Sequence, residues 1–252
     1  MKPRIAIPLP HGVDAEYAER AIPQYERAIE LSGAEPVRIP LDRTPPEVMK
    51  LIERCHGIVL PGSKADVDPA KFGAPKHPKS ESADPKRDTV DELLLQDAYN
   101  MRKPLLGICY GLQILNVYRS GTLLQHIESA VNHEAGRKVP VAHEVEIEPG
   151  SNLGNILGNR HTIPVNSSHH QSAEIIGDGL KIVARSPQDG IVEAVEGTSP
   201  DHFVLAVQWH PERSFDDDER SRAIFKALVE AAKQRHDQLI GKFEGARRAI
   251  RK

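Results

Sequence analysis

Short apolar segments alternate with longer segments of helical periodicity in the first half of the chain. This alternation is typical of a parallel sheet covered by helices on both faces. The expected strands are residues 4–8, 36–39, 57–60 and 104–108, and the expected helices are residues 22–32, 44–54 and 88–101. The sequence therefore predicts an α/β three-layer sandwich with a mostly parallel central sheet.

Local signals place the ends of two of these helices. Pro23 falls in the first turn of the expected helix over 22–32, and Gly33 follows its end, which is the usual asymmetry of the two residues. Thr44 and Glu47 have the spacing of a capping box, with proline at the first helical position between them. We expect a short helix to begin at Thr44.

The second half of the chain changes to strict alternation of apolar and polar residues. Residues 139–147 alternate, and residues 180–186, 190–197 and 203–209 are apolar segments bounded by turn residues. These segments predict additional strands, partly antiparallel, before a terminal helix over 216–238 with an acidic start. We find no repeat and no linker, so residues 1–252 are expected to form a single domain.

Composition excludes several classes of function. The 33 basic and 36 acidic residues are mixed along the chain and give a net charge of −3, so no broad positive face for nucleic acid is expected. No run of apolar residues is long enough for a membrane span or a signal core, and a cytoplasmic location is expected. Two cysteines, Cys55 and Cys109, are too few for a disulfide scaffold.

The segment GICYG, residues 107–111, predicts a nucleophile elbow. Gly107 and Gly111 flank Cys109 at two positions on either side, between a buried strand and a helix. Such a turn is sharp, needs glycine near the neighbouring strand, and presents the nucleophile at a helix N-terminus, where the pKa of a thiol is expected to fall. The alternative is a small core cysteine at the end of an apolar strand. Cys55 has no such frame, and we expect it to be structural.

A cysteine nucleophile needs a base, and the base needs an orienting group. Of the twelve histidines, only His210 directly follows a buried strand and precedes a carboxylate two residues later. In an extended segment Glu212 projects to the same side as His210. The sequence thus predicts a triad of Cys109, His210 and Glu212; the alternative for the last two is a polar cluster at a strand end.

Acyl transfer also needs hydrogen-bond donors for the developing oxyanion. The amide of Tyr110 is one candidate, and the turn after the strand over 57–60 offers Gly62 or Ser63 as the second. Residues 61–87 hold many prolines and show no periodicity, which predicts a functional loop that walls a site.

Two adjacent histidines in the polar segment NSSHHQS, residues 166–172, raise the alternative of a zinc site with another histidine. Paired histidines in polar loops are usually not ligands, and no two-residue cysteine spacing supports a metal. We therefore expect no metal and no cofactor.

Seven motifs occur in one order along the chain: LPGSKADVDPAKFG, RD at residues 87–88, PLLGICYGLQILNV, SGTLLQ, NSSHHQ, DGIVEAVE and AVQWHPE. In this order they resemble the class I glutamine amidotransferase-like hydrolases, and most of all the gamma-glutamyl-gamma-aminobutyrate hydrolase branch. The resemblance spans the chain from the first strand to the terminal helix. It implies a flavodoxin-like fold and an acylated Cys109. It also implies that Gln113 meets the glutamyl head and that the backbone of Ser168, His169 and His170 binds its carboxylate.

The sequence departs from this branch beside the nucleophile, where Tyr110 replaces a more frequent arginine. A change at this position can reshape the pocket for the leaving amine, so the sequence leaves the effect of Tyr110 open. The predicted function is hydrolysis of a small gamma-glutamyl amide through a thioester. The alternatives are a glutaminase subunit that delivers ammonia to a separate synthetase, and a catalytically silent ligand-binding protein. A homodimer is possible, and the sequence leaves the leaving amine open.

Overall fold

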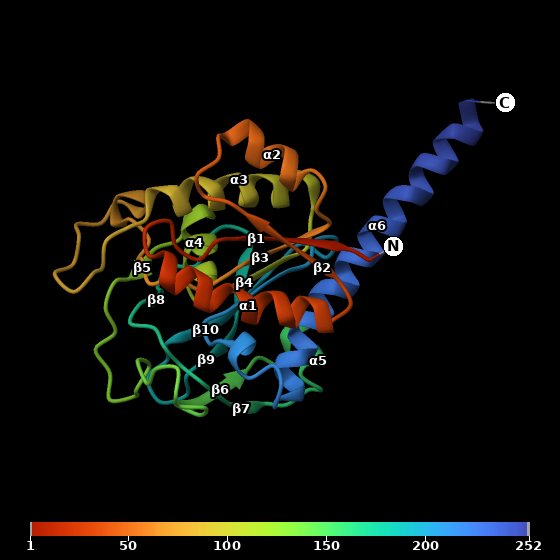
Figure 1. Cartoon of the computed structure of the whole chain (residues 1–252). Coiled ribbons are helices and arrows are strands. Elements are labelled where there is room, and N and C mark those ends of the chain that lie inside the picture. Colours follow the sequence, from red (N-terminus) through yellow and green to blue (C-terminus); the bar gives the residue numbers. More distant parts are fainter. Residues whose placement is uncertain (1, 251–252) are drawn as a thin grey trace.

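A central nine-stranded sheet organises the molecule in the computed structural model, which describes residues 2–250, and side chains within residues 2–238 (Figure 1). The strand order is β2-β1-β3-β4-β11-β10-β9-β6-β7. The first five strands in this order are mutually parallel, and the following four pair antiparallel. A separate two-stranded sheet joins β5 and β8. The predicted flavodoxin-like α/β fold with additional antiparallel strands is confirmed.

The strands of the main sheet are β1 (Arg4–Pro8), β2 (Glu35–Ile39), β3 (Gly57–Leu60), β4 (Leu105–Ile108), β6 (His143–Ile147), β7 (Thr162–Val165), β9 (Leu180–Arg185), β10 (Val192–Gly197) and β11 (Val204–Val207). The small sheet holds β5 (Leu123–Leu124) and β8 (Ser172–Ala173). The helices are α1 (Ala15–Leu31), α2 (Pro45–Ile52), α3 (Pro85–Met101), α4 (Tyr110–Tyr118), α5 (Asn152–Ile156) and α6 (Glu219–Ile250), with 3₁₀ turns at Pro69–Phe72 and Pro211–Arg213.

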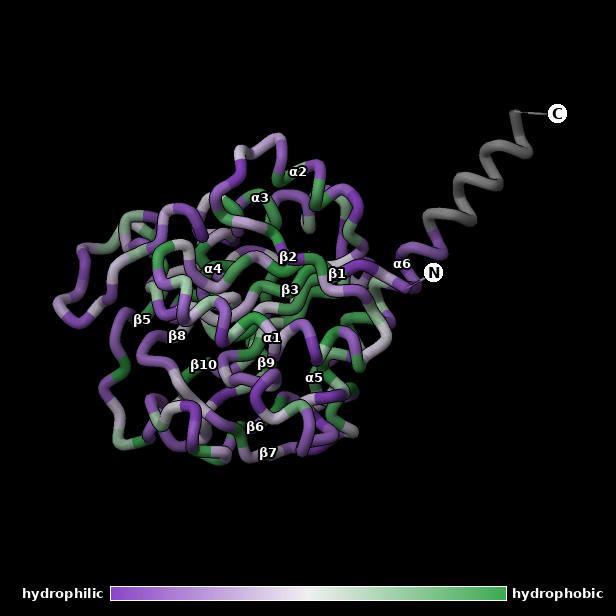
Figure 2. The backbone as a smooth tube through the Cα atoms, viewed as in Figure 1, coloured by the Kyte–Doolittle hydropathy of each residue, from purple (hydrophilic) through white to green (hydrophobic). Residues whose placement is uncertain are grey.

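Side chains of each buried strand alternate between two cores, as the period of two along a strand requires. Ile5 and Ile7 of β1 face the core shared with α1 and α6, whereas Ala6 faces the core shared with α2, α3 and α4. Figure 2 shows the hydrophobic residues concentrated in the central strands and the hydrophilic ones in the surrounding loops. The sheet is therefore covered on both faces, as predicted.

Side-chain caps set several helix ends away from the predicted positions. Asp14 accepts a hydrogen bond from the Tyr17 amide, so α1 begins well before Ile22 and contains Pro23 in its interior. Asp84 caps α3 in the same way, and that helix begins at Pro85. The Thr44 capping box is present as predicted, since the backbone amide and the side-chain hydroxyl of Thr44 both donate to the Glu47 carboxylate.

Two other boundaries also differ. The alternation over 139–147 forms a strand only at His143–Ile147, and the terminal helix begins at Glu219. The short elements β5, β7, β8 and α5 have no counterpart among the sequence predictions. Within the part of the chain that the structure describes, no helix combines the length and apolarity that crossing a membrane requires.

Candidate active site

Cys109 lies at the turn between β4 and α4, in a backbone conformation that few residues other than glycine adopt. Its φ is 53° and its ψ is −106°. Neighbouring backbone explains the two flanking glycines: a Cβ on Gly111 would lie 2.2 Å from the Leu60 carbonyl oxygen, and one on Gly107 would lie 2.7 Å from the Gly111 carbonyl oxygen. Both distances are far below van der Waals contact. The strained turn of the predicted nucleophile elbow is present.

Parallel pairing of β4 with β11 brings the second predicted residue beside Cys109. Ile108 is in register with Val207, and the Cys109 amide donates to the Val207 carbonyl oxygen at 2.8 Å. His210 follows β11 at the same edge of the sheet. A Cβ built on Gly62 would lie 3.0 Å from His210 Cε1 and 3.6 Å from Cys109 Cβ, so the two side chains flank one glycine.

His210 and Glu212 form a buried pair. His210 Nδ1 lies 2.8 Å from Glu212 Oε1, and His210 Nε2 is buried without a hydrogen-bond partner among the described residues. Asn166 fixes the backbone of the histidine from both sides: its side-chain nitrogen donates to the His210 carbonyl, and its oxygen accepts from the His210 amide, each at 2.9 Å. The imidazole is therefore held with one nitrogen available for proton transfer.

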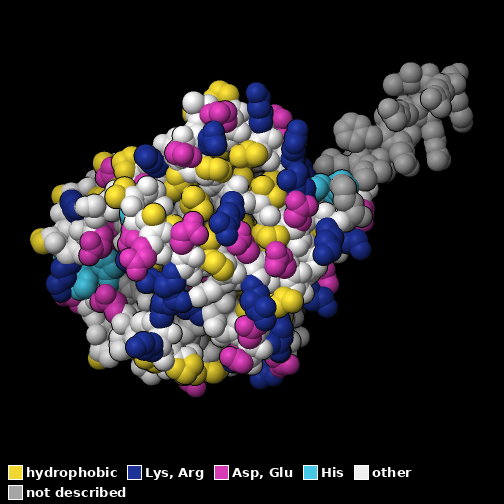
Figure 3. All heavy atoms as spheres, in the orientation of Figure 1, with side chains coloured by type: hydrophobic (Ala, Val, Ile, Leu, Met, Phe, Trp, Pro, Cys, Tyr) yellow, Lys and Arg dark blue, Asp and Glu magenta, His cyan; other side chains and the backbone are white. Residues whose placement is uncertain are grey.

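A cavity of about 560 Å³ opens at this site. Cys109 and His210 line it, together with the predicted substrate-binding residues Gln113, Ser168, His169 and His170. The loop over 61–87 contributes part of the wall, as predicted, through Ser63, Lys64, Ala65, Asp66, Lys79 and Glu81. Histidine side chains gather at the left edge of the face in Figure 3, beside basic and acidic ones.

A second cavity, of about 790 Å³, lies between α6 and the segment before β11. His202, Phe203 and Arg235 are among its lining residues, and no member of the predicted triad is. Its size therefore carries no argument for catalysis there.

Comparison with protein families decides the assignment. The family model described as Peptidase C26 matches residues 9–212, which include the elbow, the loop and His210 with Glu212. The chain belongs to the peptidase C26 family. Members of this family are cysteine-dependent hydrolases related to the class I glutamine amidotransferases.

Two curated relatives show how far the likeness extends. A Mycobacterium tuberculosis protein named "Putative glutamine amidotransferase Rv2859c" is 38% identical over 212 residues, which cover 82% of this chain and 66% of that protein. The gamma-glutamyl-gamma-aminobutyrate hydrolase PuuD of Escherichia coli K12 is 34% identical over 218 residues, which cover 82% of this chain and 84% of that protein.

A solved structure supports the fold. The glutaminase domain of the Trypanosoma brucei CTPS, solved with bound acivicin, superimposes with a TM-score of 0.61 at 19% identity and covers 91% of this chain and 94% of that one. At this identity the likeness shows a common fold alone.

In this peptidase C26 chain the pKa of the Cys109 thiol differs from the sequence prediction. Burial raises the pKa of the Cys109 thiol to about 12, against the opposing effects of Arg213 and the Tyr110 amide. The prediction of a lowered thiol pKa is therefore wrong, because enclosure of the sulfur outweighs the helix terminus. Burial likewise lowers the pKa of His210 despite Glu212, so the imidazole is neutral at pH 7.

Glu212 remains a carboxylate. Burial opposes its ionisation, but His210 and Arg213 hold the pKa of its carboxyl below the usual range. The resting site thus holds a thiol, a neutral imidazole and a carboxylate, and an imidazole in this state can accept a proton.

The predicted oxyanion donors are placed differently from one another. The Tyr110 amide faces the Cys109 sulfur. The Gly62 amide instead donates to the Tyr25 hydroxyl at 3.1 Å, and that hydroxyl donates in turn to Glu212 Oε1 at 3.1 Å. Ser63 lines the cavity. In this structure the Gly62 amide is therefore already engaged.

The side chain of Tyr110 does not shape the cavity. It is buried, donates to Asp88 Oδ1 at 2.7 Å and lies 4.9 Å beneath the guanidinium of Arg87. The sequence left the effect of Tyr110 open; in the structure its ring packs against α3 and is not among the cavity-lining side chains.

Sequence reasoning missed three positioning residues. Tyr25 reaches Glu212 from α1, Asn166 holds His210, and Arg87 donates to the carbonyl oxygens of Pro10 and Pro61 while pairing with Asp91 at 2.7 Å. Asn166 lies in the NSSHHQS motif and could have been found there. Arg87 belongs to the RD motif of the resemblance, but that motif gave it no role. The contacts of Tyr25 and Arg87 join segments distant in sequence, and no local spacing predicts them.

Proposed function

We propose that this protein hydrolyses gamma-glutamyl amides through a thioester on Cys109. The observation that carries the proposal is the strained Cys109 beside a buried His210 whose Nε2 is free and whose Nδ1 is held by Glu212. A surface polar cluster would need neither the strained backbone nor the enclosed imidazole.

The reaction begins when the Cys109 sulfur attacks the side-chain carbonyl carbon of the substrate and its proton passes to His210 Nε2. The amides of Tyr110 and Ser63 then stabilise the oxyanion. The Gly62 amide joins them if its hydrogen bond to the Tyr25 hydroxyl breaks. The carbon–nitrogen bond breaks, and the amine leaves with the proton from His210. His210 next takes a proton from water, whose oxygen attacks the thioester carbon. The carbon–sulfur bond then breaks, the sulfur takes the proton back from His210, and glutamate and the free thiol result.

Charge in the cavity supports a substrate with ionised groups of both signs. The lining holds the basic residues Arg20, Lys64, Lys79, Arg137 and Arg213 and the acidic residues Asp66, Glu81 and Glu134. A glutamyl head carries an ammonium and a carboxylate, and we assign it to Gln113 and to the backbone of Ser168–His170. Because basic groups are in excess, we propose that the leaving amine carries a carboxylate, as gamma-aminobutyrate does.

The alternative of a glutaminase subunit is less well supported. The loop over 61–87 covers one side of the cavity, where a synthetase would have to dock to receive ammonia. The alternative of a silent binding protein leaves the strained cysteine backbone without a use.

A substrate panel tests the proposal. Amine release would be measured for gamma-glutamyl amides of gamma-aminobutyrate, of a neutral alkylamine and of a diamine, and for glutamine. We expect the highest kcat/KM for the carboxylate-bearing amide, and we expect Cys109→Ala to release no amine from any of these substrates. Turnover of glutamine only, and only after a synthetase is added, would favour the glutaminase reading. No turnover of any amide would refute hydrolysis.

A further inference from the structure

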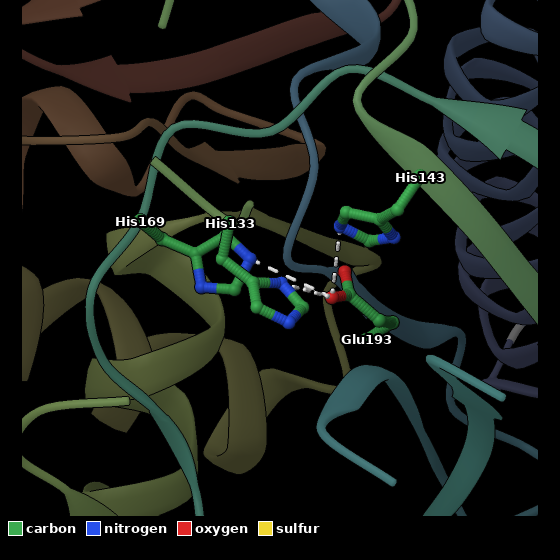
Figure 4. A group of neighbouring side chains, drawn as sticks. All are labelled: His133, His143, His169 and Glu193. Carbon is green, nitrogen blue, oxygen red and sulfur yellow. Dashed lines mark ion pairs between the residues drawn. The ribbon is translucent and has the colours of Figure 1, made fainter. Parts of the chain in front are cut away.

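Three buried histidines converge on one buried carboxylate, and none of the four belongs to the predicted triad (Figure 4). His133, His143 and His169 are at most 8% exposed, and Glu193 is fully buried. Their inward atoms all lie within 4.8 Å of one another. They come from four segments: the loop before β6, β6 itself, the NSSHHQS segment, and β10.

The outward nitrogen of each histidine is held by an acceptor. His143 Nδ1 lies 3.0 Å from the Glu144 carbonyl oxygen, and His169 Nδ1 lies 2.9 Å from the Gln171 carbonyl oxygen. His133 Nε2 lies 2.9 Å from Asp189 Oδ2. Since carbonyl and carboxylate oxygens only accept, each outward nitrogen carries the proton, and in a neutral ring the inward nitrogen presents a lone pair.

The inward atoms lack hydrogen-bond partners. The three inward nitrogens and both oxygens of Glu193 are buried, and none forms a hydrogen bond of acceptable geometry within the described residues. The only charged groups recorded near the Glu193 carboxylate there are these histidines. Four electron-pair donors that face one another without a proton or cation between them would repel, and burying them unpaired is costly.

We propose that these four side chains bind one Zn²⁺ ion. With bonds of about 2.0–2.1 Å, neighbouring ligand atoms of a tetrahedral zinc lie about 3.3–3.4 Å apart. The inward nitrogens of His133, His143 and His169 lie 3.2, 3.5 and 3.5 Å from Glu193 Oε1, close to three of the six edges of such a tetrahedron, and all four atoms lie within 4.8 Å of one another. Three imidazoles and a carboxylate are donors that zinc accepts readily.

Charge supports a divalent ion. Glu193 and Asp189 supply two negative charges at this cluster, and a divalent cation balances them. Asp189 orients His133 in the manner of carboxylate–histidine–zinc arrangements. The sequence analysis weighed a zinc site at His169 and His170 with another histidine and set it aside. The proposed site uses His169 of that pair, and its other ligands lie far away in sequence.

The proposed ion has a structural role. All four coordination positions are filled by buried side chains, so none is open to water or substrate. His169 also lines the cavity at Cys109. The ion would therefore anchor the NSSHHQS segment, which forms one wall of that cavity, to β6 and β10. This assignment does not depend on the proposed hydrolase activity.

Metal content and cobalt substitution test the site. Tag-free full-length protein, purified without chelator, should contain about one zinc per chain by plasma mass spectrometry. After chelation, titration with Co²⁺ should produce the intense visible absorption of tetrahedral cobalt. The variants His143→Gln and Glu193→Gln should lose both signals, and Asp189→Asn should weaken zinc affinity by about 10- to 100-fold.

Two matched variants serve as controls. His202→Gln removes a buried histidine that lies outside the cluster, where its Nε2 bonds the Lys103 carbonyl and its ring packs edge-on against Tyr99; this variant should keep the full zinc content. Cys109→Ala should also keep it, which separates metal binding from hydrolysis. Wild-type protein without zinc and without a tetrahedral cobalt spectrum would overturn the proposal, and so would cluster variants that retain as much zinc as wild type.

Discussion

The backbone amide of Cys109 donates a 2.8 Å hydrogen bond to the carbonyl oxygen of Val207. This bond ends the parallel pairing of β4 with β11, and beyond it both segments leave the sheet at the carboxyl ends of these strands. The segment after β4 turns into α4 through the strained cysteine, and the segment after β11 continues to His210. The proposed nucleophile and its proposed base, about a hundred residues apart in sequence, therefore meet through strand register.

The pH dependence of thiol reactivity should show that the resting site holds a thiol. Because burial raises the pKa of Cys109 to about 12, the rate of alkylation by iodoacetamide should keep rising with pH through pH 9. The measurement uses a Cys55→Ala background, so that only one thiol reacts. A plateau reached below pH 8 would indicate a preformed thiolate and contradict this charge assignment.

The pH profile of catalysis should follow His210 on the acid side. Burial lowers the pKa of this imidazole below its usual 6.5, and protonation removes the base. We expect kcat/KM to be constant near neutral pH and to fall only as the pH drops below 6.5. An acid limb centred above pH 7 would assign the base to another group.

Replacement of Glu212 by glutamine should reduce kcat more than it changes KM. The carboxylate lies 2.8 Å from His210 Nδ1 and stabilises the imidazolium that forms during attack. We expect kcat to fall by roughly 10⁴-fold, as when the orienting carboxylate of a comparable triad is replaced by its amide. The exposed Glu219→Gln is the matched control. A variant that changes KM alone would show that Glu212 binds substrate instead.

Replacement of Gly111 by alanine should destabilise the fold itself. The added Cβ would lie 2.2 Å from the Leu60 carbonyl oxygen, and backbone cannot yield as a flexible side chain can. We expect the free energy of unfolding in urea to fall by about 1–3 kcal/mol. Gly154→Ala, whose nearest neighbour is the Ser151 hydroxyl at 3.1 Å, should have a smaller effect. Equal stability of the two variants would contradict the close approach.

Replacement of Tyr25 by phenylalanine tests the bridge between Gly62 and Glu212. Loss of one hydrogen bond to the Glu212 carboxylate, worth about 1 kcal/mol, should lower kcat by roughly 2- to 10-fold with little change in KM. Tyr118→Phe on α4 is the control. A rise in kcat would instead show that Tyr25 restrains Gly62 as an oxyanion donor.

The sequence predicted the features that depend on neighbouring residues better than the features that depend on contacts between distant segments. The buried strands and the elbow depend on neighbours in sequence, and Gly107, Cys109 and Gly111 report the turn through spacing alone. His210 and Glu212 are likewise two residues apart. The start of α1 escaped prediction because its cap, Asp14, is one of many aspartates, and the cap outweighed the signal from Pro23.

Contacts between distant segments gave no such signal. Tyr25 reaches Glu212 only because α1 packs beside the end of β11, and the histidine cluster forms only when β6, β10 and two loops come together. The pKa of Cys109 escaped prediction for a related reason: a motif shows the helix terminus but not the degree of enclosure.

Intact-protein mass spectrometry after brief exposure to a gamma-glutamyl amide, with acid quench, tests the thioester most directly. The account predicts a mass increase of one glutamyl group, mapped by peptide analysis to Cys109 and missing in Cys109→Ala, while Cys55→Ala retains it. Amine release without any adduct, or release by Cys109→Ala at the wild-type rate, would contradict it.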